Sequence, residues 1–141
     1  MANHEQMGQD TAARMRISGC SPYEGRIGFS RAVRVGDGVY VSGTAPIGED
    51  GHTACRGDAF GQTLRCIEII EKALNDAGAK LADVTRVRMY IGDRKNSERI
   101  SEAFREGFGD IRPAATMIVC KLLEEDWLVE FEVDAIVGSG D

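Results

Sequence analysis

One long helix constrains the fold of this sequence more than any other feature. Its apolar positions recur at helical spacing and form one stripe: Phe60, Leu64, Ile67, Ile70 or Glu71, Leu74 and Ala77. This spacing is typical of an amphipathic helix, and Gly78 follows in the position where helices commonly end. A helix with one apolar face has to pack that face against a second layer. The sequence therefore predicts a layered domain around a helix that ends before Gly78.

Short runs of alternating or β-branched residues on both sides of this helix predict strands. They cover residues 26–35, 39–43, 84–91, 116–123 and 128–137. The glycine-rich turn 36–38 joins the first two strands as a hairpin, and a second helix begins near Asn96 or Ser97 and ends at Gly109. The order β-β-α-β-α-β-β predicts an α+β fold, a two-layer sandwich of a mixed sheet with two helices on one face.

The third and fifth predicted strands carry opposite charges on their polar faces. The third presents Arg86 and Arg88, and the fifth presents Glu130, Glu132 and Asp134. If these strands are neighbours, the arginines and carboxylates pair across the ladder. The resulting polar sheet face is either left to solvent or shared with another subunit.

The length of 141 residues is that of one ordinary domain. Residues 1–25 show no periodicity, so we expect a polar tail there and a single domain over 26–141. A formal net charge of −6 opposes binding to phosphate backbones and anionic lipids, which disfavours nucleic acid as a partner. No apolar run approaches the ~20 residues that span a bilayer, and the N-terminus lacks a signal-peptide pattern. We therefore expect no membrane partner and a cytoplasmic location.

The cysteines and histidines do not form a metal-binding pattern. The four cysteines lie at positions 20, 55, 66 and 120 without a CxxC pair, and the chain has two histidines. Only His52 and Cys55 come near the spacing of zinc ligands. We therefore predict no metal, and we interpret Cys66 and Cys120 as core residues.

Two regions near the C-terminus are candidates for chemistry. Glu132 lies on the polar face of its strand, where it is either a solvated glutamate or a carboxylate that activates a water molecule in a cleft. The segment 111–117 is either a plain helix-to-strand connection or a strand mouth, where backbone N–H groups and the Thr116 hydroxyl bind a small polar ligand. Pattern alone leaves both alternatives open.

Four blocks of the chain resemble the Rid (YjgF) superfamily. They are Phe29–Asp37, Val39–Gly43, Arg112–Thr116 and Leu128–Glu132. The match covers residues 26–137, in order and at the expected spacing. The resemblance implies a chorismate-mutase-like fold arranged as a homotrimer, with ligand clefts between subunits.

The resemblance also implies a reaction. Deaminases of this superfamily hydrolyse reactive imines and enamines, such as 2-aminoacrylate, to 2-oxo acids and ammonia without a metal or organic cofactor. The expected partner is thus a small metabolite bound at a subunit interface. A non-catalytic, trimeric protein that binds a small metabolite or has a regulatory role is the alternative, and the acidic composition argues against ribonuclease activity.

Matched position by position, the resemblance implies roles for several residues. Glu132 corresponds to the glutamate that holds the attacking water, and Ser42 with Gly43 lines the cleft. Phe29 stands where deaminases usually have a tyrosine.

The segment before the fourth predicted strand departs from the deaminase pattern. In the deaminases an arginine at this position binds the substrate carboxylate, and here Ala115 replaces it. The neighbouring residues Arg112, Thr116 and Met117 are expected to line the cleft as well. Arg112 and Arg31 are the alternative cations for that contact. The replacement puts classical 2-aminoacrylate deamination in doubt, and enzyme and binding protein both stay open.

Overall fold

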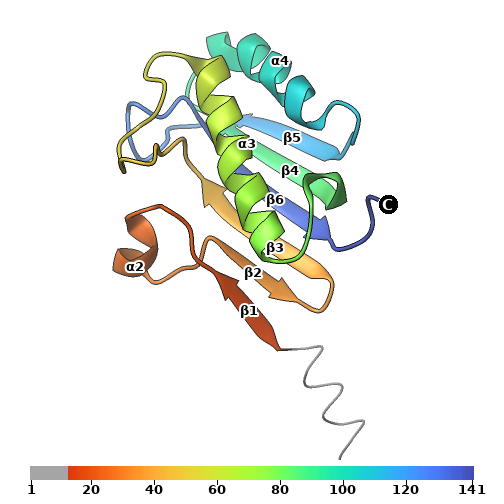
Figure 1. The fold of residues 1–141 in the computed structure, drawn as a ribbon. Coiled ribbons are helices and arrows are strands. Elements are labelled where there is room, and N and C mark those ends of the chain that lie inside the picture. Colours follow the sequence, from red (N-terminus) through yellow and green to blue (C-terminus); the bar gives the residue numbers. More distant parts are fainter. Residues whose placement is uncertain (1–12) are drawn as a thin grey trace, which may run out of the picture.

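The computed structural model describes residues 13–141 and shows one six-stranded sheet (Figure 1). The strands are β1 (Arg14–Ile17), β2 (Ala32–Val35), β3 (Gly38–Thr44), β4 (Val84–Ile91), β5 (Ala114–Val119) and β6 (Val129–Ile136). The helices are α2 (Tyr23–Ile27), α3 (Ala59–Asp76) and α4 (Ser97–Phe108), with short 3-10 turns at Leu81–Asp83 and Arg94–Asn96. Both long helices lie on one face of the sheet (Figure 1), which confirms the predicted α+β sandwich.

The strand order across the sheet is β1-β2-β3-β6-β4-β5. Neighbours run antiparallel except β4 and β5, which run parallel. A parallel pair needs a crossover, and α4 supplies it. The predicted hairpin is confirmed, because Val35 pairs with Gly38 around a two-residue turn. Gly36 adopts φ +59° there, as a tight hairpin turn requires.

Helix α3 supplies much of the core. Cys66, Ile70 and Leu74 are fully buried against the sheet. Leu64 was predicted on the buried stripe, but its side chain is 36% exposed, because the buried face runs through neighbouring positions such as Thr63 instead. The core interpretation of Cys66 is confirmed. Cys120, by contrast, is partly exposed, since it follows the edge strand β5.

The N-terminal part of the domain differs from the sequence prediction. Strand β1 and most of α2 fall within the expected tail 1–25, and residues 1–12 of that tail lie outside the described residues. β1 is ordered because it pairs along the whole of β2. The first predicted strand begins at Ala32 instead of residue 26, because Gly28 ends α2 with a left-handed φ of +97°.

Two strand boundaries near the C-terminus also shift. β5 covers Ala114–Val119 instead of 116–123, and β6 covers Val129–Ile136 instead of 128–137. The acidic turn predicted between them is a longer connection over 120–128. This connection returns over the end of the sheet, where Trp127 becomes buried with Ala45.

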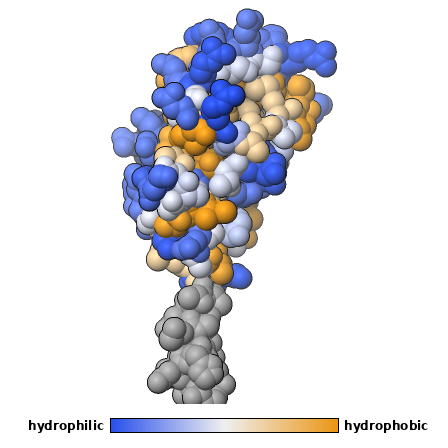
Figure 2. All heavy atoms as spheres, turned by 90° about the vertical axis from the view of Figure 1, so that its right-hand side faces the viewer, coloured by the Kyte–Doolittle hydropathy of each residue, from blue (hydrophilic) through white to orange (hydrophobic). Residues whose placement is uncertain are grey.

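The face of the sheet opposite the long helices carries the predicted charge ladder. β4 and β6 place Arg86 opposite Asp134 and Arg88 opposite Glu132. Arg88 lies 3.4 Å from an Asp134 oxygen, so the predicted pairing across the strands is confirmed. No helix among residues 13–141 is long and apolar enough to cross a membrane. Figure 2 shows the side of the molecule at the right of Figure 1, where hydrophobic spots interrupt a mainly hydrophilic surface.

Candidate functional site

A small pocket lies where α2, β3 and β6 meet, and we call it the Glu130 pocket. Its volume is about 110 Å³. Its walls are mainly apolar and aromatic, and include Tyr23, Ile27, Phe29, Ile47, Leu123 and Trp127. Its polar end consists of Ser21, Arg31, Gly43 and Glu130. Residues from the beginning, middle and end of the domain therefore converge on one cavity.

A β-bulge in β3 brings Gly43 against Glu130. Val41 pairs with Val133 and Thr44 pairs with Phe131, so two residues of β3, Ser42 and Gly43, lie opposite one residue of β6. Bulges of this kind redirect side chains beside functional sites. A Cβ atom at position 43 would lie 2.7 Å from Glu130 Oε2. Glycine is thus the residue that leaves room for the carboxylate in the pocket.

The environment of Glu130 favours its neutral form. Burial raises the pKa of the Glu130 carboxyl group, the nearby Arg31 guanidinium opposes this rise, and the Glu132 carboxylate adds to it. A carboxyl group whose pKa lies above its ordinary range holds a proton more readily and can exchange it with a bound molecule. Glu130 therefore has both the position and the proton affinity of a general acid–base group.

Arg31 is a buried cation at the edge of the same pocket. Its Nη2 donates a hydrogen bond to the carbonyl oxygen of Gly43 at 3.0 Å. Its Nε lies 4.0 Å from Glu24 Oε2, and both side chains are at least nine-tenths buried. The guanidinium also lies 5.5 Å from the centre of the Phe29 ring. Burial lowers the pKa of Arg31, and the Glu24 carboxylate counteracts this shift.

The short helix α2 covers the pocket through Tyr23. The Tyr23 ring meets Trp127 edge to face, with ring centres 5.9 Å apart. Its hydroxyl donates a hydrogen bond to Glu124 Oε2 at 2.8 Å, which raises the pKa of Tyr23. Trp127 is 5% exposed, and its Nε1–H has no acceptor within residues 13–141. The cover thus joins two distant segments over the carboxylate.

Glu132, the glutamate singled out from the sequence, lies on the same face of β6 but does not line this pocket. Its Oε1 accepts a hydrogen bond from the Tyr90 hydroxyl at 2.7 Å, and its Oε2 lies 4.0 Å from Arg88. The Glu132 side chain is 38% exposed. Its contacts belong to the charge ladder of the open sheet face.

The remaining predicted residues fall into two groups. Phe29 and Gly43 line the Glu130 pocket, and Ser42 lies beside Gly43 with its hydroxyl donated to the Ser30 carbonyl oxygen at 2.7 Å. The second group lies on or near β5, which β4 separates from β6. This group comprises Ala115, Thr116 and Met117 on the edge strand, and Arg112 before it. One chain therefore does not bring the two groups together.

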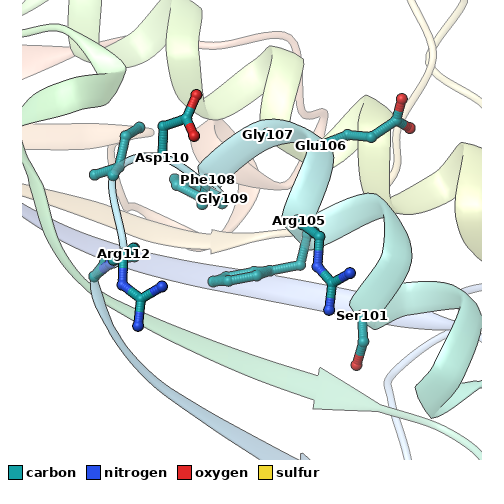
Figure 3. Close-up of a pocket in the computed structure, with 11 residues that line it drawn as sticks. Ser101, Arg105, Glu106, Gly107, Phe108, Gly109, Asp110 and Arg112 are labelled. Atoms are coloured by element: carbon teal, nitrogen blue, oxygen red, sulfur yellow. The ribbon is translucent and has the colours of Figure 1, made fainter.

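Arg112 lines a much larger, open concavity of about 970 Å³ at the end of α4. Figure 3 shows the guanidinium groups of Arg105 and Arg112 extending to one side of the ribbon, while Glu106 and Asp110 extend to the other. Arg112 has a left-handed φ of +55°, which is uncommon for a residue with a side chain. The charged residues that line this concavity are all exposed, whereas the Glu130 pocket is lined by the buried Arg31 and the partly buried Glu130.

Sequence reasoning missed Glu130 as a pocket residue. Glu130 and Glu132 share one face of a strand, so period-two alternation treats them alike. The available signal was the small pair Ser42-Gly43 on a neighbouring strand, but it identifies Glu130 only once the bulge fixes the register. Within residues 13–141, no group of three or more potential metal ligands comes together.

Comparison with known proteins shows the family to which this chain belongs. The sequence model of the family described as endoribonuclease L-PSP matches residues 23–137. A RutC family protein of Pyrococcus abyssi is 36% identical over 107 residues, which cover 76% of this chain and 84% of that protein. A RutC family protein of Pyrococcus horikoshii is 31% identical, with 76% and 85% covered.

Solved structures agree with this match. Rv2704 of Mycobacterium tuberculosis, a member of the YjgF/YER057c/UK114 family, is 39% identical with a TM-score of 0.79, over 89% of this chain and 100% of that one. YyfA of Yersinia pestis, of the Rid protein family, is 28% identical with a TM-score of 0.78 over the same shares. The chain belongs to the Rid/YjgF superfamily, in the family described as endoribonuclease L-PSP.

Proposed function

We propose that the chain is a hydrolase that deaminates a small reactive imine or enamine in the Glu130 pocket. One observation carries the proposal: a half-buried carboxylate with a raised pKa lies beside a backbone glycine in a small, mainly apolar cavity. In the reaction, a water oxygen bonds to the imine carbon and the C=N π electrons move to nitrogen. The C–N bond then breaks, leaving a carbonyl compound and ammonia.

Glu130 is the group that we assign to the attacking water. It accepts a proton as the water adds and returns it to the departing nitrogen, which is general base and then general acid catalysis. Sequence resemblance assigned this role to Glu132. We favour Glu130 because Glu132 already accepts a hydrogen bond from Tyr90 and faces Arg88 outside the pocket.

The cleft is expected to be completed by a second subunit in a homotrimer. On the edge strand β5, Ile118 is 46% exposed and Val119 is 50% exposed, which supports a covering partner. In that arrangement β5 of one subunit, with Ala115 and Thr116, lies next to the Glu130 pocket of its neighbour. Family membership supports the same assembly.

Classical 2-aminoacrylate deamination is not the activity that we favour. Its substrate carboxylate would lack the arginine that Ala115 replaces, at a cost of about 2–5 kcal/mol in binding. The same replacement favours the second candidate function, a trimeric protein that binds a metabolite without converting it. All four cysteines are free thiols, which supports our proposal of a reducing, cytoplasmic location.

Imine hydrolysis by the purified protein tests the proposal. Ammonia release from freshly generated imines is measured beside a Rid deaminase that carries the arginine. We expect turnover above the spontaneous rate for at least one imine, and weak turnover of 2-aminoacrylate. Thermal stabilisation by the same small molecules without any turnover would support the binding protein instead.

A further inference from the structure

The Glu130 pocket holds more negative than available positive charge. Two charged groups line it, Arg31 and Glu130. The Nη2 of Arg31 donates to the Gly43 carbonyl oxygen, and its Nε lies 4.0 Å from Glu24 Oε2 without a hydrogen bond, so Glu24 is the carboxylate nearest to this cation. Glu24 thus compensates the positive charge of Arg31 and leaves Glu130 as the charge that a ligand meets.

No described residue neutralises Glu130 directly. Within residues 13–141, no side chain donates a hydrogen bond to its carboxylate and no cation lies within 4.0 Å of it. A partly buried carboxylate without a partner is less favourable than a paired one, so a ligand that brings a cationic N–H group gains an ion pair there.

The walls of the pocket suit the same kind of ligand. Phe29 and Tyr23 lie on the side of α2, and Trp127 comes from the connection before β6. Cations already lie over two of these rings, Arg26 at 5.1 Å from the centre of Tyr23 and Arg31 at 5.5 Å from the centre of Phe29. Aromatic rings therefore attract cations here, whereas they offer little to a second carboxylate. The volume of about 110 Å³ corresponds to about four groups of water size, at ~30 Å³ each.

We propose that the Glu130 pocket selects the iminium cation of a short imine that carries no carboxylate, of the form R–CH=NH₂⁺ with R of two or three carbons. This inference rests on the proposed function and specifies its substrate class. A carboxylate on the imine carbon would lie close to Glu130 in a poorly solvated cavity, where like charges repel strongly. Ala115 provides no arginine to offset that repulsion.

The reaction balances without a further reactant. R–CH=NH₂⁺ and water give R–CHO and NH₄⁺: the C–O bond forms, the C–N bond breaks, and no electron is lost or gained. Imines of this class form when a primary amine is oxidised by two electrons. The supplying reaction is therefore an amine oxidation, and the product enters a reaction that consumes an aldehyde.

Binding of stable amines tests the selectivity apart from catalysis. The probes are propylamine and 2-aminobutyrate, which share one carbon chain and differ by a carboxylate. Calorimetry with the full-length protein should show propylamine binding about tenfold or more tighter than 2-aminobutyrate, as expected for one charge-assisted pair without repulsion. Glu130→Gln should lose this preference, and the matched control Glu132→Gln should keep it.

Turnover of the matching imines completes the test. Propylimine and 2-iminobutyrate are generated in place by an amine oxidase and an amino-acid oxidase, and ammonia release is followed. Hydrolysis of propylimine but not of 2-iminobutyrate supports the inference. Amine binding through Glu130 without any hydrolysis would leave the selectivity intact and remove the enzymatic function.

Three results would overturn the inference. They are equal or tighter binding of 2-aminobutyrate, faster hydrolysis of 2-iminobutyrate, and the absence of binding by either amine. Even if Glu130→Gln fails to fold, the binding preference of the unaltered protein between propylamine and 2-aminobutyrate tests the inference.

Discussion

Glu130 and Glu132 lie two residues apart on the same face of β6, yet their surroundings differ completely. Glu132 belongs to an open ladder, where Tyr90 and Arg88 satisfy it. Glu130 lies under the cover formed by α2 and the 120–128 connection, in a pocket with an aromatic wall. The two glutamates share the same position in the strand period, so periodicity does not distinguish them. The segments that pack over Glu130 do, because they place one carboxylate in a pocket and leave the other on the open sheet face.

Two local features create the difference. The bulge in β3 brings Gly43 next to Glu130, so the carboxylate fits into the end of the sheet. The pair of Glu24 and Arg31 then fixes the segment that carries Phe29. Glu132 lies opposite the bulge on its β3 side, but on its β4 side it keeps a regular register opposite Arg88.

The largest contrast is expected between the arginines of the two regions. Arg31→Met leaves Glu24 buried without its partner and should lower the free energy of unfolding by about 3–5 kcal/mol. Arg88→Met removes only partly exposed ion pairs, which are worth about 0–1 kcal/mol. Urea unfolding of both variants measures the difference. Equal losses of stability in the two variants would contradict the difference between the buried and the exposed ion pairs. If the unpaired charge of Glu24 causes the loss in Arg31→Met, the double variant Glu24→Gln, Arg31→Met should recover much of the stability.

A smaller effect is expected from filling the space at the bulge. Gly43→Ala places a methyl carbon 2.7 Å from the present position of Glu130 Oε2, so the carboxylate has to move. A displacement of this kind should lower imine hydrolysis about 10- to 100-fold, with little change in melting temperature because the neighbour that yields is a flexible side chain. Gly25→Ala, where the added Cβ atom would meet no other atom within 4 Å, is the control. Full activity in Gly43→Ala would show that the position of Glu130 is not critical.

Part of the fold can be predicted from the sequence. The helical stripe before Gly78, the hairpin at 36–38 and the ladder of Arg88 with Glu132 follow from periodicity and turn chemistry, and the structure confirms them. These features depend on neighbours along one element or across one strand pair, which is the information that periodicity carries.

The rest depends on tertiary structure. β1 has four residues and α2 has five, too short for a recognisable period, and both are stable only because they pack on the domain. The bulge that singles out Glu130 changes the register by one residue without a clear sequence signal. The group on β5 is separated from the pocket within one chain, so its proposed role depends on a second subunit.

A still smaller effect is expected when the pH is changed. The pKa of Glu130 in the folded protein is raised by burial and by Glu132, against the opposing effect of Arg31. The folded state therefore holds the proton more tightly than the unfolded state, and this contribution to stability is lost as pH rises through the raised pKa. Because the side chain keeps part of its hydration, the effect should be a few degrees in melting temperature.

Melting temperatures of the unaltered protein and Glu130→Gln, measured from about pH 4.5 to 8, test this sign. The variant should gain stability relative to the unaltered protein as pH rises. Glu132→Gln is the matched control, because Glu132 lies outside the pocket, where it contacts Tyr90 and Arg88. A relative loss of stability in Glu130→Gln at high pH would contradict the environment described for Glu130.

The smallest effect is expected at the cover of the pocket. Tyr23→Phe removes the exposed hydrogen bond to Glu124 but keeps the ring on Trp127. The melting temperature should change by less than about 2 °C, since exposed hydrogen bonds contribute little net stability. Tyr23→Ala should reduce imine hydrolysis more than Tyr23→Phe, because it also removes the aromatic wall. Equal activity in the two variants would show that the cover is not needed.

The most direct test compares the two glutamates as bases. Imine hydrolysis is measured for Glu130→Gln and Glu132→Gln, with circular dichroism and oligomeric state recorded for both variants. The account predicts a loss of about 10²- to 10⁴-fold for Glu130→Gln, the usual contribution of a general base, and near-normal turnover for Glu132→Gln. Normal turnover by a folded Glu130→Gln protein together with an inactive Glu132→Gln protein would contradict it and return the catalytic role to the open face of the sheet.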